Sequence, residues 1–171
     1  MNAKQKRSIK MTRTYDDKMF IETFEREYTW LNGFMRNVAR YGGRQALIDP
    51  LTERSWTYRE LNAEANKLAI DDVGKDDVVM AVLVNCPEFC FSYIGPRKIG
   101  AIVTLANFKL SSGELSLLIN HNKPKVVIYA AEVAEMVTEA IGMAEYKPVN
   151  AVMADNMENI PVPEGHIAYD D

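Results

Sequence analysis

The chain has 171 residues, of which 47% are hydrophobic and 26% charged, and its formal net charge is -4. This length and composition are typical of one soluble folded domain and exclude a largely disordered chain. The charge is spread along the sequence, so no broad basic surface is available for nucleic-acid phosphates, and we expect no nucleic-acid partner. No stretch approaches the roughly 20 apolar residues of a membrane span, and no secretion signal is recognisable. We therefore expect a cytoplasmic protein.

The N-terminal thirteen residues are basic and contain no acid: Lys4, Lys6, Arg7, Lys10 and Arg13. A basic arm can bind an anionic lipid or a nucleic acid. Large apolar residues do not alternate with these charges, which favours a mobile, solvated tail instead.

The first regular element is predicted between residues 28 and 41, where apolar residues recur at spacings of three and four. This spacing is typical of an amphipathic helix, and Gly42-Gly43 should end it. Residues 46–48 and 54–57 read as two short strands joined by a turn. We expect a small β-hairpin here.

A second helix is expected from Tyr58. Thr57 precedes it and Glu60 stands three residues further on, which is the pattern of a capping box. The acidic pair Asp71-Asp72, followed by Gly74, should end this helix after about three turns.

Residues 78–84 are a continuous apolar run without alternation, as expected of a strand covered on both faces of a parallel sheet. Cys86 or Asn85 can cap the next helix, with Pro87 as its first residue. Pro96 should kink or interrupt that helix, because a proline inside a helix loses one hydrogen bond and clashes with the preceding turn.

The same alternation continues to residue 153. Residues 101–105 read as a second buried strand, and Ser111 with Glu114 forms another capping box before an apolar helix. Further strands are predicted at residues 126–129 and 149–153, with a helix at residues 132–143 between them.

Strands that alternate with helices in this way imply right-handed crossovers and a parallel sheet with helices on both faces. The predicted fold class is therefore α/β. We divide the chain into a basic flexible tail and lead-in (1–27), an α/β subdomain (28–154) and a linker or frayed end (155–171). The last segment has lost the periodicity and contains Pro161, Pro163 and Gly165.

Three short motifs occur in a fixed order along this pattern. They are Trp56-Thr57-Tyr58-Arg59-Glu60-Leu61, Asn85-Cys86-Pro87-Glu88-Phe89, and Lys98-Ile99-Gly100-Ala101 leading to Asn107. Together with the segment 37–47 they resemble the start of the AMP-forming acyl-CoA synthetases, which are adenylate-forming, AMP-binding enzymes. Two residues depart from the family pattern: Leu105 stands where proline is frequent, and Pro96 where helix formers are usual. The helix after Leu61 also looks shorter by about a turn. The resemblance covers about residues 28–130 and implies the N-terminal subdomain of such an enzyme.

The resemblance also implies a chemistry. In the full-length family a carboxylic acid reacts with ATP and Mg²⁺ to give an acyl-adenylate and pyrophosphate, and the thiol of CoA then displaces AMP. The groups that stabilise this reaction belong to a Gly/Ser/Thr-rich loop with a lysine, to later acidic residues, and to a lysine on a C-terminal domain. None of these motifs occurs in this sequence. The one glycine pair, Gly42-Gly43, precedes a predicted strand, whereas a phosphate-binding loop follows one. We therefore expect no catalytic, cofactor-binding or metal-binding residue in this stretch, no bound cofactor, and no activity from it alone.

Local alternatives for chemistry are weaker. Cys86 and Cys90 are four residues apart, but neither histidine is near them in sequence, so buried structural thiols are favoured over a metal site or a nucleophile. The acidic pairs 71–72 and 76–77 lack the ligand spacing of a calcium loop and read as a solvated turn.

Two hypotheses of function remain, besides a dinucleotide-binding oxidoreductase, which the missing glycine fingerprint sets aside. The first is the N-terminal part of an acyl-CoA synthetase for a fatty acid or a similar hydrophobic acid. The second is a non-catalytic α/β interaction module that pairs with another chain, either as a homo-oligomer or with the remainder of an enzyme.

Overall fold

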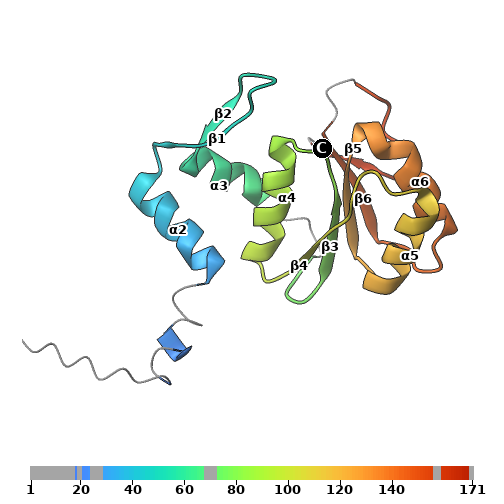
Figure 1. Ribbon diagram of the computed structural model, residues 1–171, viewed down its shortest axis with the longest axis horizontal. Coiled ribbons are helices and arrows are strands. Elements are labelled where there is room, and N and C mark those ends of the chain that lie inside the picture. The colour runs from blue at the N-terminus through green and yellow to red at the C-terminus, as the bar shows by residue number, and fades with distance from the viewer. Residues whose placement is uncertain (1–17, 19–20, 24–28, 68–72, 156–158, 170–171) are drawn as a thin grey trace, which may run out of the picture. The chain divides into compact units, whose positions relative to one another are not determined.

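The computed structural model describes residues 18, 21–23, 29–67, 73–155 and 159–169 (Figure 1). It consists of two units, Met1–Arg36 and Asn37–Asp171. Most of the predicted tail, 1–27, lies outside the described residues. In the first unit the rings of Trp30 and Phe34 stack at a centroid distance of 5.7 Å, near the start of helix α2 (Trp30–Tyr41). The predicted helix is thus present, although residue 28 lies outside the described residues.

The predicted hairpin follows α2. Strand β1 (Gln45–Ile48) pairs antiparallel with β2 (Ser55–Thr57), and helix α3 (Tyr58–Lys67) begins directly after β2. The backbone amide of Thr57 donates to the Glu60 carboxylate at 2.8 Å, and the Glu60 amide donates to the Thr57 hydroxyl at 3.3 Å. These two bonds satisfy amides that the first helical turn leaves free, which confirms the predicted capping box. The predicted end of the helix at 71–74 lies partly outside the described residues.

The main sheet has five parallel strands in the order β4-β3-β5-β6-β7. Their bounds are β3 (Val78–Val82), β4 (Ile102–Leu105), β5 (Val126–Ala130), β6 (Asn150–Asp155) and β7 (Ile167–Ala168). The α/β fold class with a parallel sheet is confirmed. The chain first moves from β3 outward to β4 and then returns past β3 to β5, so the direction of strand addition reverses between β3 and β5.

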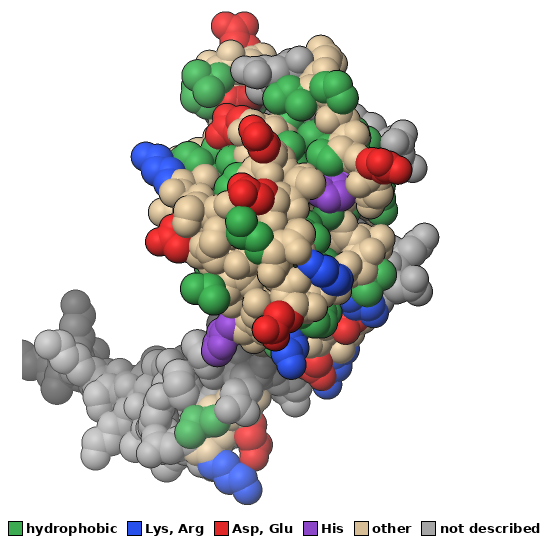
Figure 2. Space-filling view, turned by 90° about the vertical axis from the view of Figure 1, so that its right-hand side faces the viewer, with side chains coloured by type: hydrophobic (Ala, Val, Ile, Leu, Met, Phe, Trp, Pro, Cys, Tyr) green, Lys and Arg blue, Asp and Glu red, His purple; other side chains and the backbone are tan. Residues whose placement is uncertain are grey.

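The crossover helices cover both faces of the sheet. They are α4 (Pro87–Lys98), α5 (Ser112–Asn122) and α6 (Ala134–Met143), with the 3₁₀ turn η1 (Ala131–Val133) before α6. Right-handed crossovers in opposite directions place helices on opposite faces. In Figure 1, α3 and α4 accordingly lie on one side of the sheet and α5 and α6 on the other. Figure 2 shows this second side, where acidic and hydrophobic side chains are intermingled on the surface.

The core is centred on β5, all five residues of which are buried. The side chains from Val79 to Val82 in β3 are also buried, with exposed fractions of 1% or less. A continuous apolar run suits this position because both faces of each strand are covered by helices.

Strand β4 differs from its prediction. It was expected to be buried, but it is the edge of the sheet, and 53% of Ile102 and 49% of Leu105 are exposed. The apolar run of β4 matches that of a buried strand, whereas its place at the edge follows from the return of the chain past β3. The apolar residues of β4 alone do not indicate that the chain passes back beyond β3.

Two further expectations need correction. Pro96 does not interrupt α4, which continues to Lys98. It lies in the last turn, where the amides of Ile99 and Ala101 both donate to its carbonyl, at 3.2 and 3.0 Å, and end the helix. The segment predicted as linker or frayed end also contains a strand, because β7 pairs with β6. The division into 1–27, 28–154 and 155–171 remains a prediction.

Gly42 offers a test of the junction between α2 and β1. A Cβ atom there would lie 2.7 Å from the Val38 carbonyl oxygen, whereas a Cβ on Gly43 would meet nothing within 4 Å. We expect Gly42→Ala to lower the free energy of unfolding by about 1 to 3 kcal/mol, because the backbone must move. Gly43→Ala should change it by less than about 0.5 kcal/mol. Urea denaturation measures both, and equal effects would contradict the close approach at Gly42.

Helix α5 provides a second matched pair. Ile119 is fully buried and Leu117, two residues earlier, is 67% exposed. Ile119→Ala should lower the free energy of unfolding by about 2 to 5 kcal/mol through lost burial and a residual cavity. Leu117→Ala should change it by less than about 0.5 kcal/mol. The same denaturation experiment compares them, and the packing of α5 is wrong if Leu117→Ala is the more damaging.

Candidate functional site

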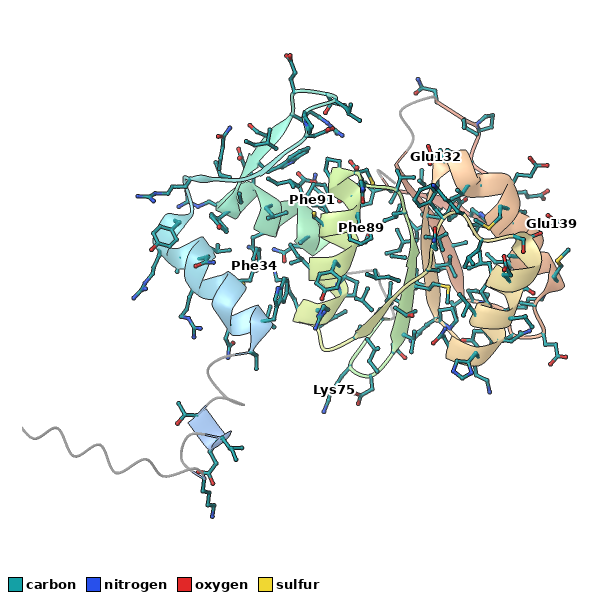
Figure 3. The ribbon with its side chains drawn as sticks, viewed as in Figure 1. Phe34, Lys75, Phe89, Phe91, Glu132 and Glu139 are labelled. Carbon is teal, nitrogen blue, oxygen red and sulfur yellow. The ribbon has the colours of Figure 1, made fainter. Side chains whose placement is uncertain are left out.

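The candidate site is a crevice at the carboxyl ends of β3 and β5. Open parallel sheets bind ligands at the carboxyl ends of their strands, at the point where the direction of strand addition reverses. The crevice has a volume of about 440 Å³. Its floor is formed by residues 84–88, which follow β3 and begin α4, and by residues 130–132, which follow β5. In Figure 3, Glu132 is labelled at this edge of the sheet.

The β1–β2 hairpin supplies one wall of the crevice through Asp49, Leu51 and Arg54. Asp49 shapes the turn of the hairpin, since its carboxylate accepts from the Leu51 amide at 3.0 Å and from the Thr52 hydroxyl. The hydrogen bond from Thr52, followed by the one from Leu51, holds the pKa of Asp49 below its ordinary value. Asp49 is therefore a carboxylate at neutral pH.

Arg54 connects this wall to α4. Its guanidinium lies 3.6 Å from the Glu88 carboxylate and 3.9 Å from that of Asp49. The same group lies over the Trp56 ring at 5.2 Å, and Trp56 contacts the buried ring of Phe91 edge-on at a centroid distance of 5.5 Å. Glu88 is itself only 7% exposed. The charge on Arg54 thus balances a buried carboxylate and holds the hairpin against α4.

The crevice does not fit a nucleotide polyphosphate. Three carboxylate side chains line it, from Asp49, Glu88 and Glu132. Arg54 is the one Lys or Arg among the described residues that line it, and it already contacts two of those carboxylates. A polyphosphate needs several backbone amides or cationic groups directed at it. The excess of negative charge opposes this, and we derive no ATP-dependent step from these residues.

Cys86 and Cys90 are both half-buried, so the expectation of buried thiols is wrong in degree. Both line a smaller depression of about 230 Å³ between the hairpin and α4, which keeps them partly open to solvent. Burial, and secondly the negative charge of Glu88, raises the pKa of the Cys90 thiol. A raised pKa disfavours the nucleophilic thiolate.

The acidic positions considered as a cation site lie elsewhere. Asp77 directly precedes β3, at the amino ends of the strands, whereas the crevice lies at their carboxyl ends. Its carboxylate accepts from the Gly74 amide at 2.8 Å and pairs with Lys125 at 3.0 Å, and these contacts lower its pKa. Asp71 and Asp72 lie outside the described residues. Within the described ranges no three His, Cys, Asp or Glu side chains are grouped to hold a metal ion.

Sequence reasoning did not identify the crevice. The signal was available, because residues 85–88 and 130–132 directly follow two predicted strands, and ligands bind at the carboxyl ends of such strands. The contribution of Arg54 was not accessible in this way, since it depends on how the hairpin folds over α4. No helix in the described part of the chain is long and apolar enough to span a membrane.

Known proteins are similar to this chain in sequence and in fold. Residues 34–166 match the model of the family described as AMP-binding enzyme. The chain is 37% identical over 106 residues to 4-coumarate--CoA ligase 3 of Oryza sativa subsp. japonica, which covers 60% of this chain and 19% of that relative. It is 34% identical over 97 residues to the long-chain-fatty-acid--CoA ligase FadD13 of Mycobacterium tuberculosis, covering 54% of this chain and 19% of the relative.

Among solved structures, the N-terminal domain of FACL13 from Mycobacterium tuberculosis matches with a TM-score of 0.62 at 30% identity. The match covers 70% of this chain and 31% of that one. The chain thus spans about a fifth of the length of the two curated relatives. Since the family model matches well over half of its residues, the chain belongs to the AMP-binding enzymes and corresponds to the N-terminal part of the acyl-CoA and 4-coumarate-CoA ligases.

Proposed function

We propose that residues 1–171 form the N-terminal folded part of an AMP-forming acyl-CoA ligase. The reaction joins a hydrophobic carboxylic acid to CoA while ATP is converted to AMP and pyrophosphate. The family match over residues 34–166, from within α2 to the residue before β7, carries this proposal. The two relatives are named as CoA ligases of 4-coumarate and of long-chain fatty acids, which supports an acid with a large apolar body. We place the protein in the cytoplasm.

In this proposal residues 1–171 supply the folded support of the enzyme and none of its reacting groups. ATP, Mg²⁺ and CoA are cofactor and substrates of the full-length enzyme, and they bind to groups outside this stretch. The acidic crevice supports this view, because Asp49, Glu88 and Glu132 would repel a polyphosphate at neutral pH.

A chimaera tests the proposal. Residues 34–166 replace the matching N-terminal segment of 4-coumarate--CoA ligase 3 of Oryza sativa, and acid-dependent pyrophosphate release and CoA thioester formation are measured. We expect both activities in the chimaera, because the exchanged segment provides fold and not reacting groups. The acceptor enzyme without that segment should have neither activity.

Residues 1–171 alone provide the complementary measurement. We expect no acid-dependent pyrophosphate release above the protein-free blank. Turnover by these residues would show that they hold the reacting groups, contrary to the proposal. A folded chimaera that forms no thioester with any hydrophobic acid tested would also count against it, with circular dichroism reporting the folding.

The alternative of a non-catalytic interaction module rests on a separate observation, the exposed edge of β4. An unpaired strand edge with the apolar side chains of Ile102 and Leu105 favours association with another chain. Sedimentation of the wild-type chain and of Ile102→Lys tests this alternative, with Leu117→Lys, at an exposed position on α5, as the control. Association that only Ile102→Lys abolishes would support it, and a monomer at all concentrations would oppose it.

A further inference from the structure

Residues 159–169, which we call the strap, are held on the sheet by a short strand and by side-chain contacts. Strand β7 lies in the strap and pairs with β6 through two residue pairs, Val152 with Ile167 and Met153 with Ala168. The amide of Tyr169 adds one bond to the Met153 carbonyl at 3.0 Å. So short a ladder has little stability of its own, and side-chain contacts must contribute to holding the strap in place.

The central side-chain contact joins the strap to the core of the sheet. The Tyr129 hydroxyl on β5 lies 2.6 Å from Nδ1 of His166, and the two rings meet edge-on at a centroid distance of 5.5 Å. Tyr129 is completely buried. The amide of His166 donates to the Pro163 carbonyl at 3.0 Å, which fixes the backbone that carries the ring. Further along, the Tyr169 hydroxyl donates to the Glu64 carbonyl in α3 at 3.3 Å.

The proton of the Tyr129 hydroxyl has an acceptor in this contact only when the imidazole of His166 is neutral. A phenol hydroxyl can donate to Nδ1 only while Nδ1 carries no proton. When the ring is protonated, Nδ1 becomes a donor, and the hydroxyl proton of Tyr129 must find another acceptor. Within the described chain, the hydroxyl of Tyr129 makes no other hydrogen bond. Since leaving a buried donor without an acceptor is costly, protonation weakens the contact.

In the described part of the chain, His166 is not paired with an opposite charge. None of the ion pairs in the described chain includes His166. Glu164, in the same turn, is exposed, and Asp155 ends β6 with its side chain outside the described part. In α3 the Glu64 carboxylate pairs with Lys67 at 2.9 Å, and the backbone carbonyl of Glu64 accepts from the strap. On α6, Glu135 and Glu139 line a groove together with Pro161 and Pro163 of the strap. From β5 the facing group is the Tyr129 phenol itself.

Burial favours the neutral form of both partners. It lowers the pKa of His166 below its ordinary value and raises the pKa of Tyr129 to about 12. Both groups are therefore held neutral around pH 7 while the strap is docked.

We propose that the Tyr129–His166 pair is a pH-sensitive contact that releases the strap on acidification while β3 to β6 stay folded. Protons bind more readily to His166 when the strap is detached, since the released ring regains its ordinary pKa near 6.5. Docking is therefore complete above about pH 6.5 and weakens as the pH falls below that value. The strap supplies Ile160 to the crevice and Ile160, Pro161 and Pro163 to a groove beside α6, so its release opens both.

Amide hydrogen exchange at single-residue resolution tests this on the whole chain between pH 7.5 and 5.5, after correction for intrinsic rates. Protection of the Tyr169 amide should fall by up to about tenfold between pH 7.5 and 5.5. Protection of the Ile128 amide in β5 should stay constant. Tyr129→Phe should lower the protection of Tyr169 already at pH 7.5, because the contact is lost.

Two histidine variants identify the titrating group. His166→Gln keeps an oxygen acceptor for Tyr129 but cannot titrate, so its protection should not depend on pH. His121→Gln, at an exposed position near the end of α5, should respond to pH as the wild type does. The proposal is overturned if the wild type shows no pH dependence at Tyr169, or if His166→Gln shows the same dependence as the wild type.

A second measurement covers the case in which a variant does not fold. Nuclear magnetic resonance of the wild type follows the His166 ring and the amides of Ile167 and Ala168 during one titration. The amide shifts should change with the same midpoint as the ring. A ring that titrates without any change in these amides would also overturn the proposal.

Discussion

The pairing of β3 with β5 is the contact on which the rest of the architecture depends. Val79 aligns with Val126 and Val82 with Tyr129, so segments nearly fifty residues apart lie side by side in parallel. All of β5 is buried between the helical layers, and this burial provides the main driving force for bringing the segments together. With β5 on one side of β3, β4 takes the other side and forms the edge of the sheet in the described chain. The crossovers then run in opposite directions, and helices cover both faces of the sheet.

The same pairing creates the crevice. The chain leaves β3 toward α4 and leaves β5 toward α6, so the two strand ends diverge and leave an opening between them. The hairpin closes one side, held by Arg54 between the Asp49 and Glu88 carboxylates. The strap contributes Ile160 to the lining. Elements from four parts of the chain thus meet where parallel sheets place their ligands.

Much of the fold could be predicted from local sequence signals. The two capping boxes, at Thr57 and Ser111, fix the starts of α3 and α5 through contacts between residues three positions apart. The apolar runs of β3 and β5 identified strands covered on both faces. The motif order between Trp56 and Asn107 identified the family, because each motif lies at a junction of these elements and its spacing follows from them.

The features that could not be predicted depend on distant contacts. The run of β4 resembles that of β5, and only the route of the chain makes one an edge and the other the centre. Strand β7 has two residues and acquires its conformation from β6 and from the contact of His166 with Tyr129, which the local sequence does not encode. Pro96 was misjudged because its effect depends on where the helix ends, and α4 ends two residues later.

The central claim is that β3 and β5 are parallel neighbours whose carboxyl ends form the crevice. Nuclear Overhauser contacts between backbone protons of residues 79–82 and 126–129 measure this pairing directly. We expect contacts that advance in the same direction along both strands, with Val79 near Val126 and Val82 near Tyr129. Contacts that run in opposite directions, or that place β5 beside β4, would contradict it.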